Sequence, residues 1–195
     1  MKKYLLGCAI AACLPSVASA QDAAPAAPTD FAGARIEARL GWETPTVSSD
    51  GEVYKIGQAV SYGAEAGFDI QAGERLVVGP YANIDFSGVE ACTTDDECVS
   101  IDHNISAGLR VGYEVTPNGL LYGKVGYARL RISAELEDIE GSVNQGGISG
   151  AIGFEMNFGN GPLYGNIEAN YADYGDFGGI NLQRRHVAIG LGARF

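Results

Sequence analysis

The sequence predicts an all-β protein, an eight-stranded antiparallel up-and-down transmembrane β-barrel. Three observations support this fold class. Eight segments alternate apolar and polar residues with a period of two, which is typical of strands with two different faces. Most of these segments reach about ten residues, the length that a tilted strand needs to cross a bilayer. Long polar connections alternate with tight turns along the chain, as in transmembrane barrels.

The first twenty residues carry the features of an export signal. Two lysines precede the apolar run 4–14, and the segment ends in small residues at Ala20. This pattern predicts a signal peptide, residues 1–20, that is removed after Ala20. A short anchoring helix and a lipoprotein signal at Cys13 are the alternatives. The run 4–14 is shorter than the roughly 20 residues of a membrane-spanning helix.

The mature chain predicted by this cleavage is acidic. Cleavage removes two lysines and no acid, so the formal net charge shifts from −11 to −13. A chain of this charge repels nucleic acid, and we expect no nucleic-acid partner. Residues 21–30 are rich in Ala and Pro and lack periodicity, which predicts a flexible periplasmic linker. Residues 31–195 then form a single barrel domain.

The alternation begins at Ala34, where apolar residues occupy the even positions and polar residues the odd ones. In the fifth segment we place Val125 outward, because the opposite choice puts Lys124 in lipid at a cost of about 2–4 kcal/mol. The predicted strands cover residues 34–43, 60–71, 76–87, 99–115, 121–127, 148–158, 163–171 and 186–195. The long connections are expected at residues 44–57, 88–98, 135–146 and 172–182.

The polar face decides which side of the sheet meets lipid. It is rich in Gly and small polar residues, and only 19% of the chain is charged. A soluble barrel or sandwich, the alternative, exposes more lysine and longer side chains. Because a bilayer offers no partners for backbone N–H and C=O groups, a sheet with its apolar face in lipid must close on itself.

The inward charges predict a lumen filled by side chains, without a wide pore. An eight-stranded barrel has an interior just wide enough for side chains. We expect an ion-pair network of Arg35, Glu37, Arg39, Glu43, Glu65, Asp69, Asp85, Arg110, Glu114, Lys124, Glu155, Glu168 and Arg194. A narrow porin-like channel for small solutes is the alternative, because inward glycines such as Gly63 and Gly126 leave gaps beside these charges.

Two cysteines, Cys92 and Cys98, remain after cleavage and flank an acidic segment. In the oxidising compartment to which an exported chain goes, this spacing predicts a disulfide. A metal site needs more Cys or His ligands nearby, so we predict no metal and no other cofactor. The acidic clusters 95–97 and 135–140 are interpreted as solvated charge, with Ca²⁺ or Mg²⁺ binding as the alternative.

Two segments resemble a known family. The end of the chain, residues 186–195, is similar to the assembly signal of outer-membrane proteins, with Gly190, Ala193 and Phe195 at the expected offsets and Ala188 where a polar residue is usual. Residues 121–128 (LYGKVGYA) resemble the fifth strand of the OmpA/OmpX-like small barrels, which include opacity-type porin-family proteins. The resemblance extends over residues 31–195 as a pattern.

The resemblance implies a structural or surface protein of the outer membrane of a Gram-negative bacterium. It also implies handling by periplasmic chaperones and the barrel assembly machinery, and contact with outer-membrane lipid and lipopolysaccharide as a monomer. In the predicted register four arginines lie just above the membrane, where lipopolysaccharide phosphates are expected: Arg129, Arg131, Arg184 and Arg185.

Loop-mediated adhesion and lipid A modification stay open as alternative functions. Lipid A deacylases among the small barrels use a His-x-Ser pair with a carboxylate. In this chain Ser106 follows His103 at one position too far, and His186 has no nearby serine. We therefore predict that the protein is not an enzyme.

Overall fold

The computed structural model describes residues 31–49, 52–92, 98–136, 139–159, 161–177 and 180–195. The predicted signal peptide, the predicted linker and the segment between the two cysteines lie outside these residues. Within the described ranges, no helix is long and apolar enough to cross a membrane.

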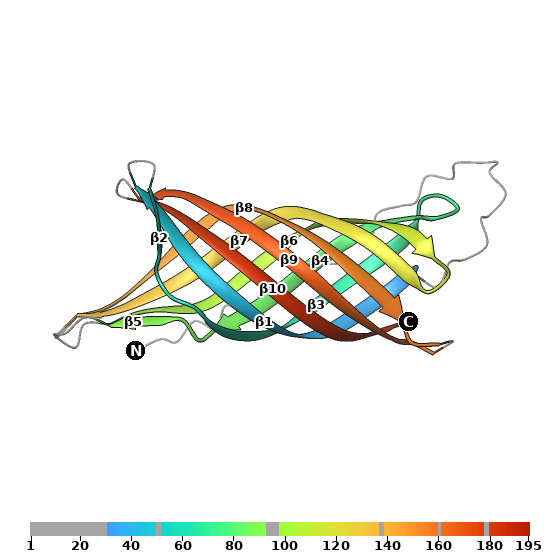
Figure 1. Ribbon diagram of the computed structural model, residues 1–195, viewed down its shortest axis with the longest axis horizontal. Helices are drawn as coiled ribbons and strands as arrows, with labels where there is room; N and C mark the ends of the chain where they lie inside the picture. Colours follow the sequence, from blue (N-terminus) through green and yellow to red (C-terminus); the bar gives the residue numbers. More distant parts are fainter. Residues whose placement is uncertain (1–30, 50–51, 93–97, 137–138, 160, 178–179) are drawn as a thin grey trace, which may run out of the picture.

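The described part of the chain contains ten strands (Figure 1). Eight long strands form the wall, and β2 and β5 are short additions to it. The strands are β1 (Gly33–Ser49), β2 (Glu52–Lys55), β3 (Ala59–Gln71), β4 (Leu76–Ser87), β5 (Glu90–Cys92), β6 (Cys98–Thr116), β7 (Gly119–Leu136), β8 (Ile139–Asn157), β9 (Leu163–Phe177) and β10 (Ile180–Arg194).

The wall closes into a barrel. Its strands follow the order β10-β9-β8-β7-β6-β4-β3-β1, and β1 pairs with β10 to join the two edges. Every neighbouring pair is antiparallel, and the chain moves to the next strand of the wall each time. The predicted eight-stranded up-and-down barrel is confirmed, and its closure leaves no unpaired edge across the membrane.

The two faces of the wall have the predicted character. Lys124 is 7% exposed and its neighbour Val125 is 60% exposed, which confirms the orientation chosen for the fifth segment. Charged residues of β1 such as Arg35 and Arg39 are buried, and Ile36 and Leu40, which follow them directly in the sequence, are exposed on the outside. The barrel is therefore inside out relative to a soluble protein: the lumen is polar and the outer surface apolar.

The prediction of long connections was wrong for three of the four segments, because strands continue through most of the residues in these segments. β7 and β8 pair without interruption from Gly119 opposite Met156 to Leu136 opposite Ile139. Residues 44–49 belong to β1, and 172–177 to β9. Apolar alternation marks only the part of a strand that meets lipid, whereas the backbone ladder continues into water with polar side chains. We name the end that carries these extensions the outer end, because long connections of such barrels face outward and short turns face the periplasm.

The predicted outward stripe of β6 is also wrong near the outer end. The register with β7 shifts between Ile101 and His103, and an extra residue there reverses the alternation. Ile101 is consequently 5% exposed and points inward, although the sequence pattern placed it on the lipid side.

The β5–β6 ladder brings Cys92 opposite Cys98. This register supports the predicted disulfide, which remains a prediction. We expect the tryptic peptide 76–110 of the mature protein, which contains both cysteines, to resist alkylation until it is reduced and then to take up two alkyl groups. Recovery of both cysteines as free thiols from protein isolated under thiol-blocking conditions would contradict it.

Candidate functional site in the barrel lumen

The outer end of the lumen contains an apolar cluster. Leu130 and Tyr174 are at most 1% exposed, and they belong to the set Val89, Ile101, Ala128, Leu130, Ala172, Tyr174 and Leu182. The cluster combines Val89 and residues of β6 and β7 with residues of β9 and β10. It forms because the strand extensions turn apolar side chains inward once the outer surface is in water. None of these residues was predicted to fill the lumen.

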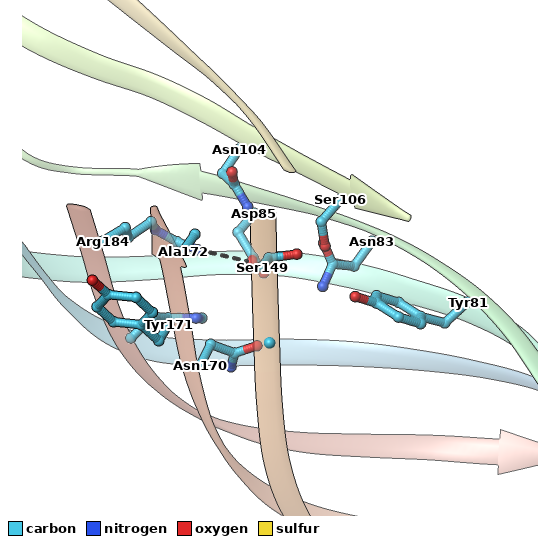
Figure 2. A pocket seen from close by; sticks show the side chains of 12 residues that line it. Tyr81, Asn83, Asp85, Asn104, Ser106, Ser149, Asn170, Tyr171, Ala172 and Arg184 are labelled. Atoms are coloured by element: carbon cyan, nitrogen blue, oxygen red, sulfur yellow. Dashed lines mark hydrogen bonds and ion pairs between the residues drawn. The ribbon is translucent and has the colours of Figure 1, made fainter. Parts of the chain in front are cut away.

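A small polar cavity lies between this cluster and the charged centre of the barrel (Figure 2). It has a volume of about 20 Å³, enough for an ordered water. Its lining includes Asn83, Asp85, Ser106, Asn170 and Arg184. The side chains meet from β4, β6, β9 and β10, so the cavity spans the lumen.

His186 lines the same cavity and has a serine partner. Its Nε2 lies 2.9 Å from the Oγ of Ser61 across β1. Gly41 makes this possible, because a Cβ there would lie 2.0 Å from the same Nε2. The interpretation that His186 has no serine nearby was therefore wrong, since proximity in sequence does not show proximity across a closed barrel. Both side chains are at most 3% exposed, so a bulky substrate such as a lipid has no access to them.

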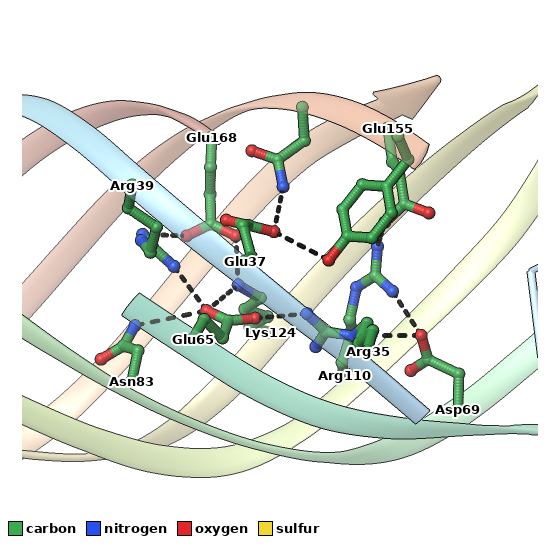
Figure 3. A network of polar contacts seen from close by, with 12 residues as sticks. Arg35, Glu37, Arg39, Glu65, Asp69, Asn83, Arg110, Lys124, Glu155 and Glu168 are labelled. Atoms are coloured by element: carbon green, nitrogen blue, oxygen red, sulfur yellow. Dashed lines mark hydrogen bonds and ion pairs between the residues drawn. The ribbon is translucent and has the colours of Figure 1, made fainter. Parts of the chain in front are cut away.

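The centre of the lumen holds two groups of ion pairs (Figure 3). Glu65 is the hub of the first: it accepts hydrogen bonds from Arg35 and Lys124, each at 2.7 Å, and from Arg39. Arg39 reaches Glu168 on β9 at 2.8 Å, and Lys124 also pairs with Glu168. Three cations around one carboxylate offset part of the charge that closure of the barrel buries.

The second group lies nearer the periplasmic end. Asp69 pairs with Arg110 at 2.6 Å and with Arg194 at 2.9 Å. Glu155 pairs with the same two arginines, each at 2.6 Å. Arg35 links the two groups, because its Nε lies 3.2 Å from Asp69. The network therefore crosses the lumen and joins strands that are not neighbours in the wall.

Tyrosines pack against the cations of both groups. Arg110 stacks over Tyr122 with 4.0 Å between its Cζ and the ring centre, and Lys124 lies 5.0 Å from the ring of Tyr81. Arg194 lies over Tyr164 at 5.4 Å. Such contacts favour cations most where water is excluded. These tyrosines were not predicted as part of the site, although Tyr122 and Tyr164 occupy inward positions of the sequence alternation.

Most predicted network residues take part in ion pairs, with two exceptions and one addition. Glu37 accepts hydrogen bonds from Tyr164 at 3.2 Å and from Asn166, and it has no ion pair among the described residues. Glu114 is half-buried near the periplasmic end and forms no ion pair with any described residue.

Arg184 is the addition to the network. It was predicted to face lipopolysaccharide, and this is wrong: Arg184 is 4% exposed and pairs with Glu43 at 2.5 Å and with Asp85 at 3.6 Å. β10 continues outward with unchanged alternation, so Arg184 shares the inward face with His186.

Neighbouring groups occupy the space over the inward glycines. A Cβ on Gly67 would lie 2.7 Å from the guanidinium of Arg35, and one on Gly126 would lie 2.7 Å from the Tyr81 hydroxyl. On Gly63 it would lie 2.1 Å from a backbone oxygen of β4. The small residues thus make room for long side chains.

The periplasmic end contains a second apolar cluster, formed by Phe31, Val77, Leu120 and Tyr122. Phe31 is fully buried, and its carbonyl accepts a hydrogen bond from Arg194 at 2.5 Å. Gly33 turns the chain into the lumen with a φ of 121°, and a Cβ there would lie 2.3 Å from the Phe195 carbonyl oxygen. Phe31, two residues before the first strand, therefore folds back under the charged network.

Phe195 closes the wall at this end through backbone hydrogen bonds with Ala34 of 2.8 and 3.1 Å. Its side chain is 78% exposed on the outside. Gly190 faces the lumen, where a Cβ would lie 2.4 Å from a Glu37 carboxylate oxygen. The assembly role predicted for Gly190, Ala193 and Phe195 stays a prediction.

Three of the four predicted surface arginines face outward. Arg129, Arg131 and Arg185 are exposed, and they alternate with the buried Ala128, Leu130 and Arg184 or His186. Arg131 pairs loosely with Asp102 at 3.3 Å. Two tyrosines lie on the same outer surface. Tyr127 is two residues from Arg129 on β7, towards the membrane centre, and Tyr171 on β9 is opposite Arg185. The arginines therefore lie at the outer rim of the apolar band.

Within the described part of the chain, no group of three His, Cys, Asp or Glu side chains gathers to hold a metal ion.

Comparison with known proteins agrees with this architecture. The solved structure of Neisserial surface protein A is similar with a TM-score of 0.58 and 13% identity, covering 82% of this chain and 97% of that one. Ail, the attachment invasion locus protein of Yersinia pestis, solved in complex with the heparin analogue sucrose octasulfate, is similar with a TM-score of 0.54 and 13% identity, covering 82% and 99%. No curated protein matches the sequence. The family model described as "Outer membrane protein beta-barrel domain" matches residues 9–195, and the chain belongs to that family.

Proposed function

We propose that the protein is exported by its signal peptide to the outer membrane of a Gram-negative bacterium and acts there as a structural or surface barrel with a filled lumen. It is not an enzyme in this proposal, and it forms no wide pore. The observation that carries the proposal is the succession of groups along the lumen: an apolar cluster at each end, with the charged network between them.

Each part of this succession opposes the passage of solutes. The ion pairs joining β1 to β9 and β6 to β8 cross the lumen, so a solute has to break them to pass. Burial of unpaired charge is costly, and these pairs therefore resist opening. The side chains of Leu130 and Phe31 in the two apolar clusters offer no polar partners to a hydrated ion. The side chains over the inward glycines argue against the narrow-channel alternative.

Single-channel recording tests the proposal. We expect the purified mature protein in planar bilayers to show no steps of the size of general porins. A double variant, Phe31→Ala with Leu130→Ala, shortens both apolar clusters and serves as the comparison, with the ion pairs intact. Porin-size conductance of the unmodified barrel would overturn the proposal.

The outward arginines support a contact with lipopolysaccharide. Arg129, Arg131 and Arg185 lie at the outer rim, where the phosphates of the outer leaflet are expected, and guanidinium groups bind phosphates well. We expect the midpoint of unfolding to be higher in nanodiscs with lipopolysaccharide than in phosphatidylcholine. Arg129→Gln with Arg131→Gln should remove this difference, and Arg75→Gln in the exposed periplasmic turn should leave it unchanged. An equal difference in all three proteins would contradict the contact.

A further inference from the structure

The buried charges of the lumen do not balance. Among the described residues six basic and seven acidic side chains are buried. The basic ones are Arg35, Arg39, Arg110, Lys124, Arg184 and Arg194, and the acidic ones are Glu37, Glu43, Glu65, Asp69, Asp85, Glu155 and Glu168. Burial removes the hydration of a charge, so a buried carboxylate without a counter-charge is costly. The described lumen therefore has one carboxyl group in excess of its cations.

The carboxyl group in excess is that of Glu37. Each of the other six acidic side chains pairs with at least one of the six cations. Glu37 forms no ion pair with any described residue, and its hydrogen-bond donors are neutral. These donors are the Tyr164 hydroxyl and the Asn166 amide, and both donate to the same oxygen, Oε2. They satisfy that oxygen and leave the charge of an ionised Glu37 uncompensated.

The cations near Glu37 are already engaged. Arg39 and Lys124 act on Glu37 electrostatically, and so do the carboxyl groups of Glu65 and Glu168. Arg39 and Lys124 each pair with both of these other carboxylates (Figure 3). Glu65 is moreover directly opposite Glu37 in the β1–β3 ladder. An ionised Glu37 would therefore place a third negative charge beside two that share the same cations.

Strand β10, which pairs with β1 on the other side of Glu37, brings no counter-charge. Gly192 is directly opposite Glu37 in this ladder. The inward arginines of β10, Arg184 and Arg194, pair with other carboxylates. The inward histidine of β10, His186, has its Nε2 beside a serine hydroxyl and forms no ion pair with any described residue. No group of β10 therefore balances the charge of Glu37.

Glu37 and Asn166 bring two accepting oxygens to the same place. Oε1 of Glu37 and Oδ1 of Asn166 both lie over Gly190, where a Cβ would be 2.4 Å from the first and 2.7 Å from the second. Oδ1 of Asn166 is buried and has no hydrogen-bond donor among the described residues. An ionised carboxylate and an amide oxygen can only accept. A proton on Oε1 of Glu37 would supply the donor that Asn166 lacks, while the amide donates back to Oε2.

We propose that the lumen binds one proton at Glu37, whose neutral carboxylic acid donates a hydrogen bond to Oδ1 of Asn166. Six buried negative charges of the described chain then face six buried positive ones. A glutamate exposed to water is ionised at neutral pH, so the barrel takes up this proton as it folds. Its release at alkaline pH leaves an unpaired charge beside Glu65 and destabilises the barrel. The proposal depends on the burial of the lumen and not on the role of the protein at the cell surface.

Infrared spectroscopy of the carboxylic-acid C=O stretch tests the proposal, because ionised carboxylates do not absorb there. The mature barrel is reconstituted in ether-linked phosphatidylcholine, which has no ester carbonyl to mask the band. We expect a protonated-acid band at neutral pH that Glu37→Gln removes. Glu114→Gln is the control and should leave the band in place, because Glu114 also lacks an ion pair among the described residues but is half-buried near the periplasmic end, where water solvates it.

Absence of the band from the unmodified barrel would overturn the proposal, and so would a band that survives Glu37→Gln. Either result is expected if Glu37 is ionised and is neutralised by a sodium ion or solvated by water. Tyr164→Phe identifies the group without removing it, because the tyrosine hydroxyl donates to the carbonyl oxygen of the acid. A hydrogen bond lowers the stretching frequency of a carbonyl, so this variant should shift the band to higher wavenumber. An unshifted band would contradict its assignment to Glu37.

Urea titrations in lipid vesicles at two pH values give an independent readout. Because folding takes up a proton at Glu37, the midpoint of unfolding should fall as the pH rises from about 5 to about 8. Glu37→Gln takes up no proton at this position, so its midpoint should fall less over the same interval. An equal fall in both proteins would contradict proton uptake at Glu37.

Discussion

Glu65→Gln is expected to lower the free energy of unfolding by about 3–5 kcal/mol, the usual cost of breaking a buried ion pair by removing one partner. Glu65 is 1% exposed and accepts hydrogen bonds from Arg35, Arg39 and Lys124. The glutamine amide has the same shape and no charge, so three buried cations lose their shared carboxylate. Urea titration of the protein in lipid vesicles, followed by the gel shift between folded and unfolded barrel, measures the effect.

Glu37→Gln is the matched control for this prediction. Glu37 lies directly opposite Glu65 in the β1–β3 ladder and is 3% exposed, so the substitution changes the same group at the same depth. Its partners are the neutral donors Tyr164 and Asn166, and it has no ion pair among the described residues. We expect little or no loss of stability. Equal losses from both variants would show that burial of a carboxylate, rather than the cations around Glu65, determines the cost.

Leu109→Arg is expected to reduce the free energy of unfolding by about 2–4 kcal/mol, the cost of a cation on the lipid face near the middle of a membrane. Leu109 is 54% exposed on the outside, and it pairs with Pro80 and Val125 within the apolar band. Leu109→Ala removes the side chain without adding charge and is the control. The same vesicle titration applies. Equal stability of the two variants would mean that position 109 does not face hydrocarbon.

The membrane-spanning part of each strand was predictable because lipid and lumen impose opposite demands on successive residues. Ile36 and Leu40 alternate with Arg35 and Arg39 for this reason, and the structure has them on opposite faces. Beyond the membrane the outer face meets water and the inner face meets an apolar cluster, so the alternation of apolar and polar residues no longer marks the strand. The extension of β8 from residue 147 to Ile139 was therefore read as a loop.

The candidate site was predictable as a set of inward charges and not as a set of partners. Alternation gives the face of Arg39, but its partner Glu168 is on β9, which does not neighbour β1 in the wall. The stagger of the strands decides such pairs, and no local pattern records it. Arg184 was misplaced because the length of β10 was underestimated, and Glu37 shows that an inward carboxylate can rely on neutral donors.

The apolar face of the wall meets lipid and the polar face lines the lumen, and a nitroxide scan along β7 tests this orientation most directly. Single cysteines at residues 120–127, in a background where Cys92 and Cys98 are serine, carry the label in lipid vesicles. We expect oxygen accessibility to peak at Leu121, Gly123, Val125 and Tyr127, and to fall at the alternate positions. Peaks at the alternate positions, or the absence of a period of two, would contradict a lipid-facing apolar surface around a polar lumen.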